Sequence, residues 1–245
     1  MKEPTADLSR RFGGIKRLYG ETALNRFQNA HVCVVGIGGV GSWAAEALAR
    51  TGIGAITLIL ARTAVGRLTL IDLDMVAESN VNRQIHALGD AFGKAKTDAM
   101  AERILAINPS CRVSAIEDFV SQDNLAQMLD KGFDYVIDAI DNVRTKAAMI
   151  SWCKAHNTPI ITDLTRTIQD PLLSKVRSVL RKEYGFSRDT KKKFGVPAVF
   201  SSEPLRYPEN GAACEEAQTL TGLNCAGYGS SVCVTGPFGL FAAGE

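Results

Sequence analysis

The sequence predicts an α/β fold: a Rossmann-like, doubly wound, mostly parallel sheet with an irregular C-terminal extension. Two observations predict it. A short apolar run near residue 31 passes through a glycine turn into a helical pattern, and β-rich runs then alternate with helical segments up to about residue 162. The chain has 245 residues, 46% of them apolar, and can bury the core of such a domain without disulfides or metals.

The first strand and helix carry the clearest local signals. Residues 1–30 are polar and helical in parts, and the run HVCVV at 31–35 then predicts a buried strand. GIGGVG follows at 36–41, and 42–50 has the pattern of a helix that Gly52 ends. Strand, glycine turn and helix in this order form the first βα unit of a nucleotide-binding fold.

The later elements alternate in the same way. We expect helices at about 94–107, 124–129 and 143–156, and strands at 113–116, 135–138 and 159–162. An amphipathic helix is expected near 171–180, followed by a basic segment. Because no long linker interrupts the chain, we expect a single domain over 1–245: an N-terminal helical arm (1–30), a nucleotide-binding core (31–162), and a basic helical segment with the C-terminal part (163–245).

Composition limits where this chain could act. Its net charge is +2, so contact with nucleic acid has to rest on a local patch; the candidates are Arg181, Lys182, Arg188, Lys191, Lys192 and Lys193. The N-terminus has no secretory signal and the six cysteines are scattered, which favours the cytoplasm. The apolar stretch 228–244 is marginal for a membrane span, and we expect a buried strand and helix start there rather than an anchor.

A tandem repeat lies beside the expected nucleotide site. Residues 60–71 repeat 48–59 with eight of twelve positions identical. An acid that binds ribose is expected about twenty residues after the glycine turn, but Leu60 stands at that place, right after the first copy. The acid follows only the second copy, as Asp72 with Asp74 nearby, so the second copy is predicted to supply the functional strand.

Several polar residues after Asp72 favour a triphosphate. The spacing of Gly36, Gly38 and Gly41 by itself allows a dinucleotide, ATP or a tight turn without ligand. Asn80, Arg83 and Lys96 have no use in a dehydrogenase but can orient and neutralise phosphate oxygens, and a carboxylate such as Asp141 can hold Mg²⁺. An NAD-dependent dehydrogenase is therefore a distant alternative.

The motifs GIGGVG, LIDLDMV, SNVNRQIHAL, GKAK and DAIDN, in this order, resemble the adenylating domain of the ubiquitin-activating-enzyme-like superfamily. Within it, RFGGIKRLYG, NRQIHAL, TIQDPL and VFSSEP resemble the family of tRNA threonylcarbamoyladenosine dehydratases. The resemblance implies that ATP and Mg²⁺ are used, with Arg83, Lys96 and Asp141 catalytic and Asp141 on the metal. The implied nucleotide-binding residues are Gly36, Gly38, Gly39, Gly41, Asp72, Asp74, Asn80, Arg83, Lys96, Asp141 and Asn142.

The resemblance also implies a reaction and partners. A carboxylate of the modified adenosine beside the tRNA anticodon attacks the ATP α-phosphate, pyrophosphate leaves, and ring closure releases AMP. The implied partners are tRNA, held by the basic segment, and a second copy of the chain, with Arg11 or Arg17 as the candidate arginine that reaches a neighbouring subunit. A sulfur-acceptor protein of a cysteine desulfurase system is a further expected partner.

Two alternatives stay open. The first is an enzyme that adenylates the C-terminal glycine of a small sulfur carrier, although the C-x-x-C pairs that hold zinc in such relatives are missing and no structural zinc is expected. The second is a nucleotide-binding protein with impaired turnover, because about fifteen residues of a glycine-rich loop are missing after Thr162. Cys225 is a candidate reactive thiol, and the alternative is a buried, inert thiol. His86 is a candidate catalytic base, and the alternative is a histidine packed inside the fold.

Overall fold

The computed structural model describes residues 6–59, 75–116, 120, 123–161, 168–189, 191–203 and 230–245. Asp72, Asp74, the second copy of the repeat (60–71), the segment 162–167 and Cys225 lie outside the described residues.

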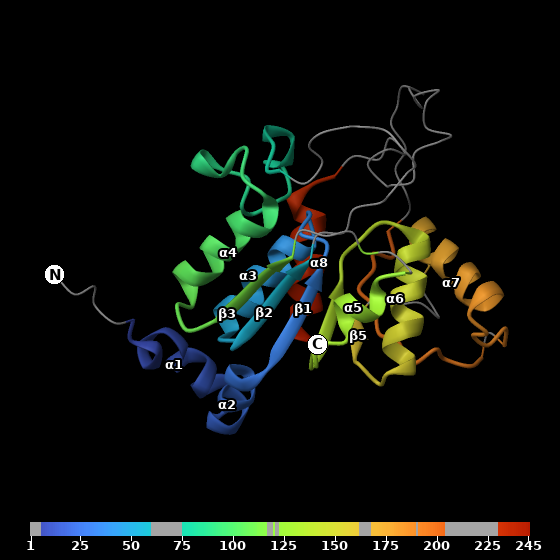
Figure 1. Ribbon diagram of the computed structural model, residues 1–245, viewed down its shortest axis with the longest axis horizontal. Coiled ribbons are helices and arrows are strands. Elements are labelled where there is room, and N and C mark those ends of the chain that lie inside the picture. The colour runs from blue at the N-terminus through green and yellow to red at the C-terminus, as the bar shows by residue number, and fades with distance from the viewer. Residues whose placement is uncertain are drawn as a thin grey trace.

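The described strands form one parallel sheet (Figure 1). Its order is β3-β2-β1-β4-β5, and every neighbouring pair is parallel. The strands are β1 (His31–Val35), β2 (Ala55–Ile59), β3 (Arg112–Ile116), β4 (Tyr135–Asp138) and β5 (Ile160–Ile161). This order places the first strand in the middle. The chain adds β2 and β3 on one side of β1 and then β4 and β5 on the other, as in doubly wound nucleotide-binding folds. The predicted fold class is confirmed.

Eight α-helices accompany the sheet in the described residues. They are α1 (Leu8–Tyr19), α2 (Glu21–Asn29), α3 (Gly41–Thr51), α4 (Lys96–Ile107), α5 (Leu125–Leu129), α6 (Val143–Ala155), α7 (Pro171–Glu183) and α8 (Val232–Gly244), with the short 3₁₀ turns η1 (Glu78–Asn80) and η2 (Gly89–Ala91). α1 and α2 form the expected N-terminal arm, and Gly52 ends α3 in the left-handed conformation. The expected helices and strands up to α7 are confirmed, with small shifts at their ends.

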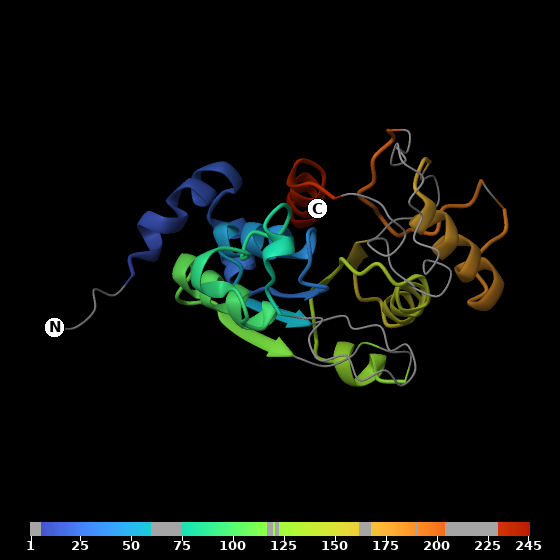
Figure 2. The same ribbon diagram turned by 90° about the horizontal axis from the view of Figure 1, so that it is seen from above.

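Two apolar layers hold the helices on the sheet. Val32 and Val34 of β1 belong to the cluster that includes α3 and α4, whereas Cys33 and Val35 belong to the cluster that includes α5, α6 and α7. Successive side chains of a strand point to opposite faces, so one continuous apolar strand serves both layers. Seen from above, α7 is an outer helix, with α6 between it and the sheet (Figure 2).

The place beside β1 is taken by the first copy of the repeat. β2 pairs with β1 from His31↔Ala55 to Val35↔Ile59, and its other edge pairs with β3. Sequence spacing predicted the second copy as the functional strand; that copy lies outside the described residues, and the strand that pairs with β1 in the described part of the chain is residues 55–59 of the first copy. A run that begins right after Gly52 and Gly54 enters the sheet by the shortest connection.

The C-terminal stretch is helical throughout its described length after Ser231, so the strand expected there is not present in 230–245. α8 packs along α3 (Figure 1). A Cβ at Gly239 would meet the Val40 carbonyl oxygen and lie 2.8 Å from the Ala44 nitrogen, so this close approach requires glycine. None of the helices in the described part of the chain is both long and apolar enough to cross a membrane.

Candidate functional site

The site forms where β1 ends and α3 begins. Gly36 has φ +93°, and a Cβ there would lie 2.9 Å from the Ala139 carbonyl oxygen. A Cβ at Gly41 would collide with the Gly36 carbonyl oxygen. A Cβ at Gly38, in contrast, would meet no atom of the described residues within 4 Å. The turn is therefore closed on its inner side and open at its tip, the arrangement in which backbone N–H groups at a helix N-terminus receive an anionic group.

The loop after β4 packs against this turn. The Ala139 nitrogen donates to the Val35 carbonyl over 2.8 Å, which continues the ladder between β1 and β4. Asn142 begins α6 as its N-cap, with its Oδ1 accepting a hydrogen bond from the Thr145 nitrogen at 2.9 Å. Asp141, half-buried, precedes that cap. The structure thus brings Asp141 and Asn142 to the same edge of the sheet as the glycine turn, while the Asn142 oxygen is used within the helix cap.

A buried ion pair supports this loop, and sequence analysis did not single it out. Lys146 Nζ lies 2.8 Å from Asp138 Oδ1, with side-chain exposures of 4% and 0%. The same Oδ1 accepts from the Ile140 nitrogen at 3.2 Å, so the carboxylate also shapes the start of the loop. The signal was present in the sequence, as a lysine inside the apolar run of α6 eight residues after the first acid of DAIDN.

Arg83 lies against the glycine turn. Its Cδ would be 3.3 Å from a Cβ at Gly39, and its Nη1 donates to the Ser79 carbonyl and to Asn82 Oδ1, each at 2.8 Å. Its own carbonyl accepts from the indole nitrogen of Trp43 in α3 at 2.9 Å. The segment after η1 is therefore docked on α3, and the Arg83 side chain passes beside the turn.

Asn80 and Lys96 have different surroundings. Asn80 is 7% exposed, and its Oδ1 accepts from the Ala77 nitrogen at 3.1 Å, so part of its amide closes the η1 turn. Lys96 is the first residue of α4. Burial lowers the pKa of the nearby His86 ring, and the charge of Lys96 adds to this effect. Lys94, two residues before α4, has its Nζ 2.7 Å from Oε2 of Glu102 in that helix.

α8 adds a second contact to the glycine turn that the sequence did not reveal. The Thr235 methyl carbon would be 3.2 Å from a Cβ at Gly39. Asn82 joins the two segments, because its Nδ2 donates to the Ser230 carbonyl at 2.8 Å and its carbonyl accepts from the Val232 nitrogen at 2.9 Å. Residues nearly 150 positions apart in the chain thus hold the turn together.

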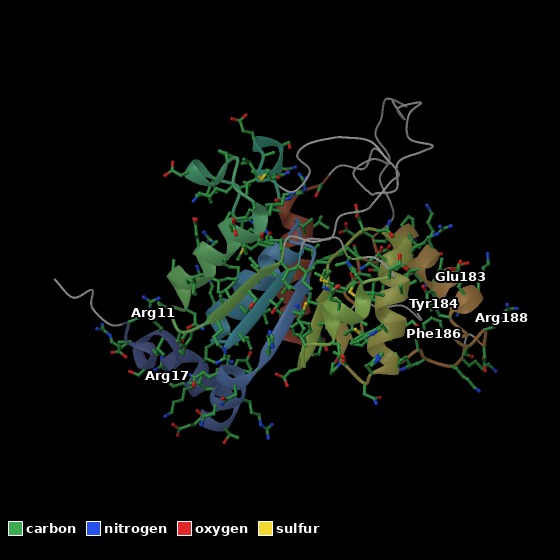
Figure 3. The ribbon with its side chains drawn as sticks, in the orientation of Figure 1. Arg11, Arg17, Glu183, Tyr184, Phe186 and Arg188 are labelled. Carbon is green, nitrogen blue, oxygen red and sulfur yellow. The ribbon has the colours of Figure 1, made fainter. Side chains whose placement is uncertain are left out.

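The two arginines of the N-terminal arm have different surroundings. Arg11 Nη1 donates to the carbonyls of Ala106 and Ile107 at 2.9 and 2.6 Å, so it caps the C-terminus of α4 in its own chain. Arg17 is exposed near the end of α1. Both lie at the end of the molecule opposite α7 (Figure 3). Of the two candidates for a contact with a neighbouring subunit, Arg11 already has a role within its own chain.

A family comparison decides between the chemistries that this geometry allows. The ThiF family matches residues 9–168, which include the glycine turn, Arg83, Lys96 and Asp141. The chain belongs to the ThiF family. This family assignment covers both the N-terminal arm and the parallel sheet, so the arm is part of the family's own pattern.

Within this ThiF-family chain, the similarity extends beyond the matched region. The tRNA threonylcarbamoyladenosine dehydratase of Escherichia coli is 50% identical over 253 residues, covering 95% of this chain and 90% of that protein. The corresponding protein of Haemophilus influenzae is 48% identical over 249 residues, with the same two coverages. The crystal structure of the Escherichia coli dehydratase in complex with ATP covers 99% of this chain and 94% of its own, at 47% identity and a TM-score of 0.81.

Proposed function

We propose that this chain is an ATP-dependent tRNA threonylcarbamoyladenosine dehydratase. The observation that carries the proposal is similarity over nearly the whole chain to a dehydratase whose crystal structure contains ATP. The local geometry agrees with it, because the glycine turn is open only at its tip and Arg83 lies beside it.

The reaction divides into two transfers. A carboxylate oxygen of the threonylcarbamoyl group attacks the α-phosphorus of ATP, the bond to pyrophosphate breaks, and an acyl-adenylate forms. A nucleophilic atom of the same modification then attacks the acyl carbon and loses its proton to solvent, and AMP leaves with the former carboxyl oxygen. The net change in the nucleoside is loss of water. Ring closure within one molecule needs correct positioning more than it needs a nucleophile from the protein.

The site residues have distinct tasks in this proposal. The first step brings one anion against another, so positive charge beside the turn lowers its barrier. Arg83 and Lys96 supply that charge, and the N-terminus of α3 binds phosphate through the N–H groups around Gly38 and Gly39. Asn80 orients phosphate oxygens. Asp72 and Asp74, which lie outside the described residues, stay predictions for the ribose.

Asp141 is the proposed ligand of Mg²⁺. Mg²⁺ is commonly held by one or two carboxylates together with substrate phosphates and water, so a single half-buried carboxylate beside a phosphate turn fits this ion. The described residues contain no group of three or more metal-binding side chains. Mg²⁺ would supply further positive charge at the phosphates.

The proposal also includes the partners of the reaction. tRNA is the substrate named for the relatives. A homodimer is supported by apolar side chains exposed on α8, with Phe241 68% and Leu240 50% accessible, and light scattering would measure it. The sulfur-acceptor protein stays a prediction without a structural observation.

Sulfur-carrier activation is not favoured, because the similarity to the Drosophila willistoni adenylyltransferase and sulfurtransferase covers only 59% of this chain at 32% identity.

The decisive experiment follows the nucleoside itself. Threonylcarbamoylated tRNA is incubated with the protein, ATP and Mg²⁺, and its nucleosides are analysed by mass spectrometry. We expect loss of one water from the modified adenosine together with AMP. Asp141→Ala should abolish both products, whereas Asp130→Ala, which removes an exposed acid after α5, should retain them.

Other outcomes would contradict the proposal in recognisable ways. ATP binding without AMP and with an unchanged nucleoside would identify a nucleotide-binding protein that has lost turnover, in line with the short connection after Thr162. ATP–pyrophosphate exchange that requires a small carrier protein and ignores tRNA would identify an activator of that carrier.

A further inference from the structure

A tryptophan at the start of α3 joins three parts of the molecule that meet at the glycine turn. Trp43 is the third residue of α3 and follows that turn directly. Its indole nitrogen donates to the carbonyl of Arg83, 40 positions further along the chain, at 2.9 Å. The same residue faces α8, which packs along α3. One side chain is therefore shared by the glycine turn, the segment that carries Arg83 and the C-terminal helix.

α8 has glycines where it lies against Trp43. A Cβ at Gly239 would lie 2.8 Å from the Trp43 Cβ, which is too close for a real side chain. A Cβ at Gly236 would lie 3.7 Å from two ring carbons of the indole, an ordinary contact distance. Both glycines are buried, and residues three apart lie on one face of a helix. The indole thus packs against the backbone of α8, while its N–H is used by the Arg83 carbonyl.

Two sets of contacts fix Arg83. The indole holds its carbonyl, and its own nitrogen donates to the Asn80 carbonyl at 3.1 Å. At the other end, Nη1 donates to the Ser79 carbonyl and to Asn82 Oδ1, each at 2.8 Å. Between the two ends, Cδ passes 3.3 Å from the place of a Cβ at Gly39. A shift of the main chain would therefore move the arginine side chain relative to the glycine turn.

The group that distinguishes tryptophan from phenylalanine at this position is the indole N–H. A neutral hydrogen bond of this kind contributes little to the stability of a whole domain. Its effect on a reaction is larger when it sets the position of a charge, because a misplacement of about 1 Å can lower a rate about a hundredfold. Phenylalanine would still place a ring against α8. The bond to the Arg83 carbonyl is what it would lose.

We infer that Trp43 is a positioning residue for adenylation, whose indole N–H fixes the main chain of Arg83 and so keeps the arginine side chain beside the turn that binds the phosphates. This inference rests on the proposed function and deepens it. The charge of Arg83 lowers the barrier only if it stays where negative charge develops. Trp43 acts through Arg83, and α8 supports the indole from the C-terminal end of the chain.

The test is a double-mutant cycle. Trp43→Phe removes the N–H, and Arg83→Gln removes the guanidinium but keeps the main-chain carbonyl. We expect Trp43→Phe to raise the dissociation constant of ATP about threefold or more. At saturating ATP it should slow AMP formation on threonylcarbamoylated tRNA about tenfold or more. The double variant should match Arg83→Gln alone, because no guanidinium is left to position.

The chain offers a matched control and a narrower substitution. Trp152, which stacks on His156 near the end of α6, is the second of two tryptophans, and Trp152→Phe should match the wild type in both readouts. In that background, an amino acid with benzothiophene in place of indole exchanges the N–H of Trp43 for sulfur and keeps the bicyclic shape. It should reproduce the effect of Trp43→Phe even if phenylalanine disturbs the packing.

A further measurement needs neither ATP nor turnover. Hydrogen exchange with mass spectrometry follows the amides of Arg83 and Gln84, which both donate to the Asn80 carbonyl, at 3.1 and 2.9 Å. Trp43→Phe should make these two amides exchange about tenfold faster, while the thermal unfolding temperature stays close to that of Trp152→Phe.

Three results would overturn the inference. Trp43→Phe could leave ATP affinity, AMP formation and exchange at their wild-type values. Its effect could add to that of Arg83→Gln, which would show a role that bypasses the guanidinium. The benzothiophene variant could behave as its Trp152→Phe parent, which would assign the effect to the shape of the ring. If the wild-type protein binds ATP but forms no AMP, the proposed function fails, whereas ATP affinity and exchange still decide the role of Trp43.

Discussion

His86 is 3% exposed, and neither ring nitrogen has a hydrogen-bond partner among the described residues. Burial lowers the pKa of its imidazole to about 4, and the nearby charges of Lys96 and Arg103 act in the same direction. The ring is therefore neutral at physiological pH and closed to solvent. This agrees with the packed histidine that the sequence favoured over a catalytic base.

Replacement of His86 by leucine should change how stability depends on pH. The folded pKa of about 4 lies below the ordinary 6.5, so the unfolded chain binds the extra proton as pH falls between these values. As the pH falls from 6.5 to about 4, this proton uptake should lower the unfolding free energy of the wild-type protein by about 3 kcal/mol. Above pH 6.5 His86 should cause no such loss. Urea unfolding at several pH values should show a flatter profile for His86→Leu; equal profiles would contradict the assignment.

Lys146 should be far more sensitive than other lysines of α6. Lys146→Met leaves the Asp138 carboxylate buried without its cation, and loss of one partner of a buried pair typically costs about 3 to 5 kcal/mol. Lys154→Met, on an exposed position of the same helix, should change stability by less than about 0.5 kcal/mol. Denaturant unfolding measures both. If Asp138→Asn/Lys146→Met does not recover part of the loss, the ion pair is not the cause.

At the scale of elements, the N-terminal arm is attached by Phe12, by hydrogen bonds of Arg11, and by the Phe27 carbonyl, which accepts from the Gly54 nitrogen at 3.0 Å. Phe12 is 3% exposed and packs on the left-handed Gly52 at the end of α3, while Arg11 caps α4. A cation at a helix C-terminus interacts favourably with the last carbonyl groups. The arm is thus anchored to the amino edge of the sheet, away from the glycine turn (Figure 3).

Arg11→Gln should therefore affect stability more than catalysis. We expect a loss of about 1 kcal/mol or less in unfolding free energy and an unchanged rate of AMP formation. Arg17→Gln serves as the comparison, because Arg17 is the remaining candidate for a contact with a neighbouring subunit. A hundredfold fall in AMP formation with Arg11→Gln at saturating ATP would contradict this and restore its proposed role across a dimer.

The contact between α8 and α3 tests whether the C-terminal helix supports the nucleotide site. Gly239→Ala places a methyl group 2.8 Å from the Ala44 nitrogen and against the Val40 carbonyl, and overpacking of this kind costs about 1 to 3 kcal/mol. Because α8 also contacts Gly39, ATP affinity should fall with it. Gly244→Ala, where a Cβ would meet nothing within 4 Å, should change neither quantity. Calorimetry of ATP binding and thermal unfolding measure the two effects.

At the scale of the whole molecule, the sheet buries three cysteines. Cys33, Cys111 and Cys153 are at most 5% exposed, and burial raises the pKa of all three thiols, to about 11 for Cys111 and about 12 for Cys153. Cys233, on α8, is exposed. The thiolate is the reactive form, so burial and a high pKa both suppress its chemistry.

Thiol labelling of the native protein should reflect this division. Maleimide followed by peptide mass spectrometry should label Cys233 quickly and leave Cys33, Cys111 and Cys153 unmodified until the protein is unfolded. Fast native labelling of Cys33 or Cys153 would show that the layer between the sheet and α6 opens readily, and that this part of the fold is less stable than its packing indicates.

The sequence by itself determined the elements whose signals are local. A β-rich run, a glycine turn and the 3.6-residue period of α4, α6 and α7 lie within short windows, so the strands, the helices and the turn with Arg83 nearby could be predicted. The order of the sheet followed, because alternating strands and helices have few right-handed parallel arrangements. The family motifs then identified the residues around the turn.

The tertiary structure alone decided that residues 55–59 of the first copy pair with β1 and β3, that α8 contacts the glycine turn, and where Arg11 binds. The two copies of the repeat have almost the same local preferences, so local propensity did not predict this pairing. The contacts of Gly239 with Val40, of Asp138 with Lys146 and of Arg11 with Ile107 join separate elements. Such contacts depend on how the elements pack together, and no periodicity within one segment encodes them.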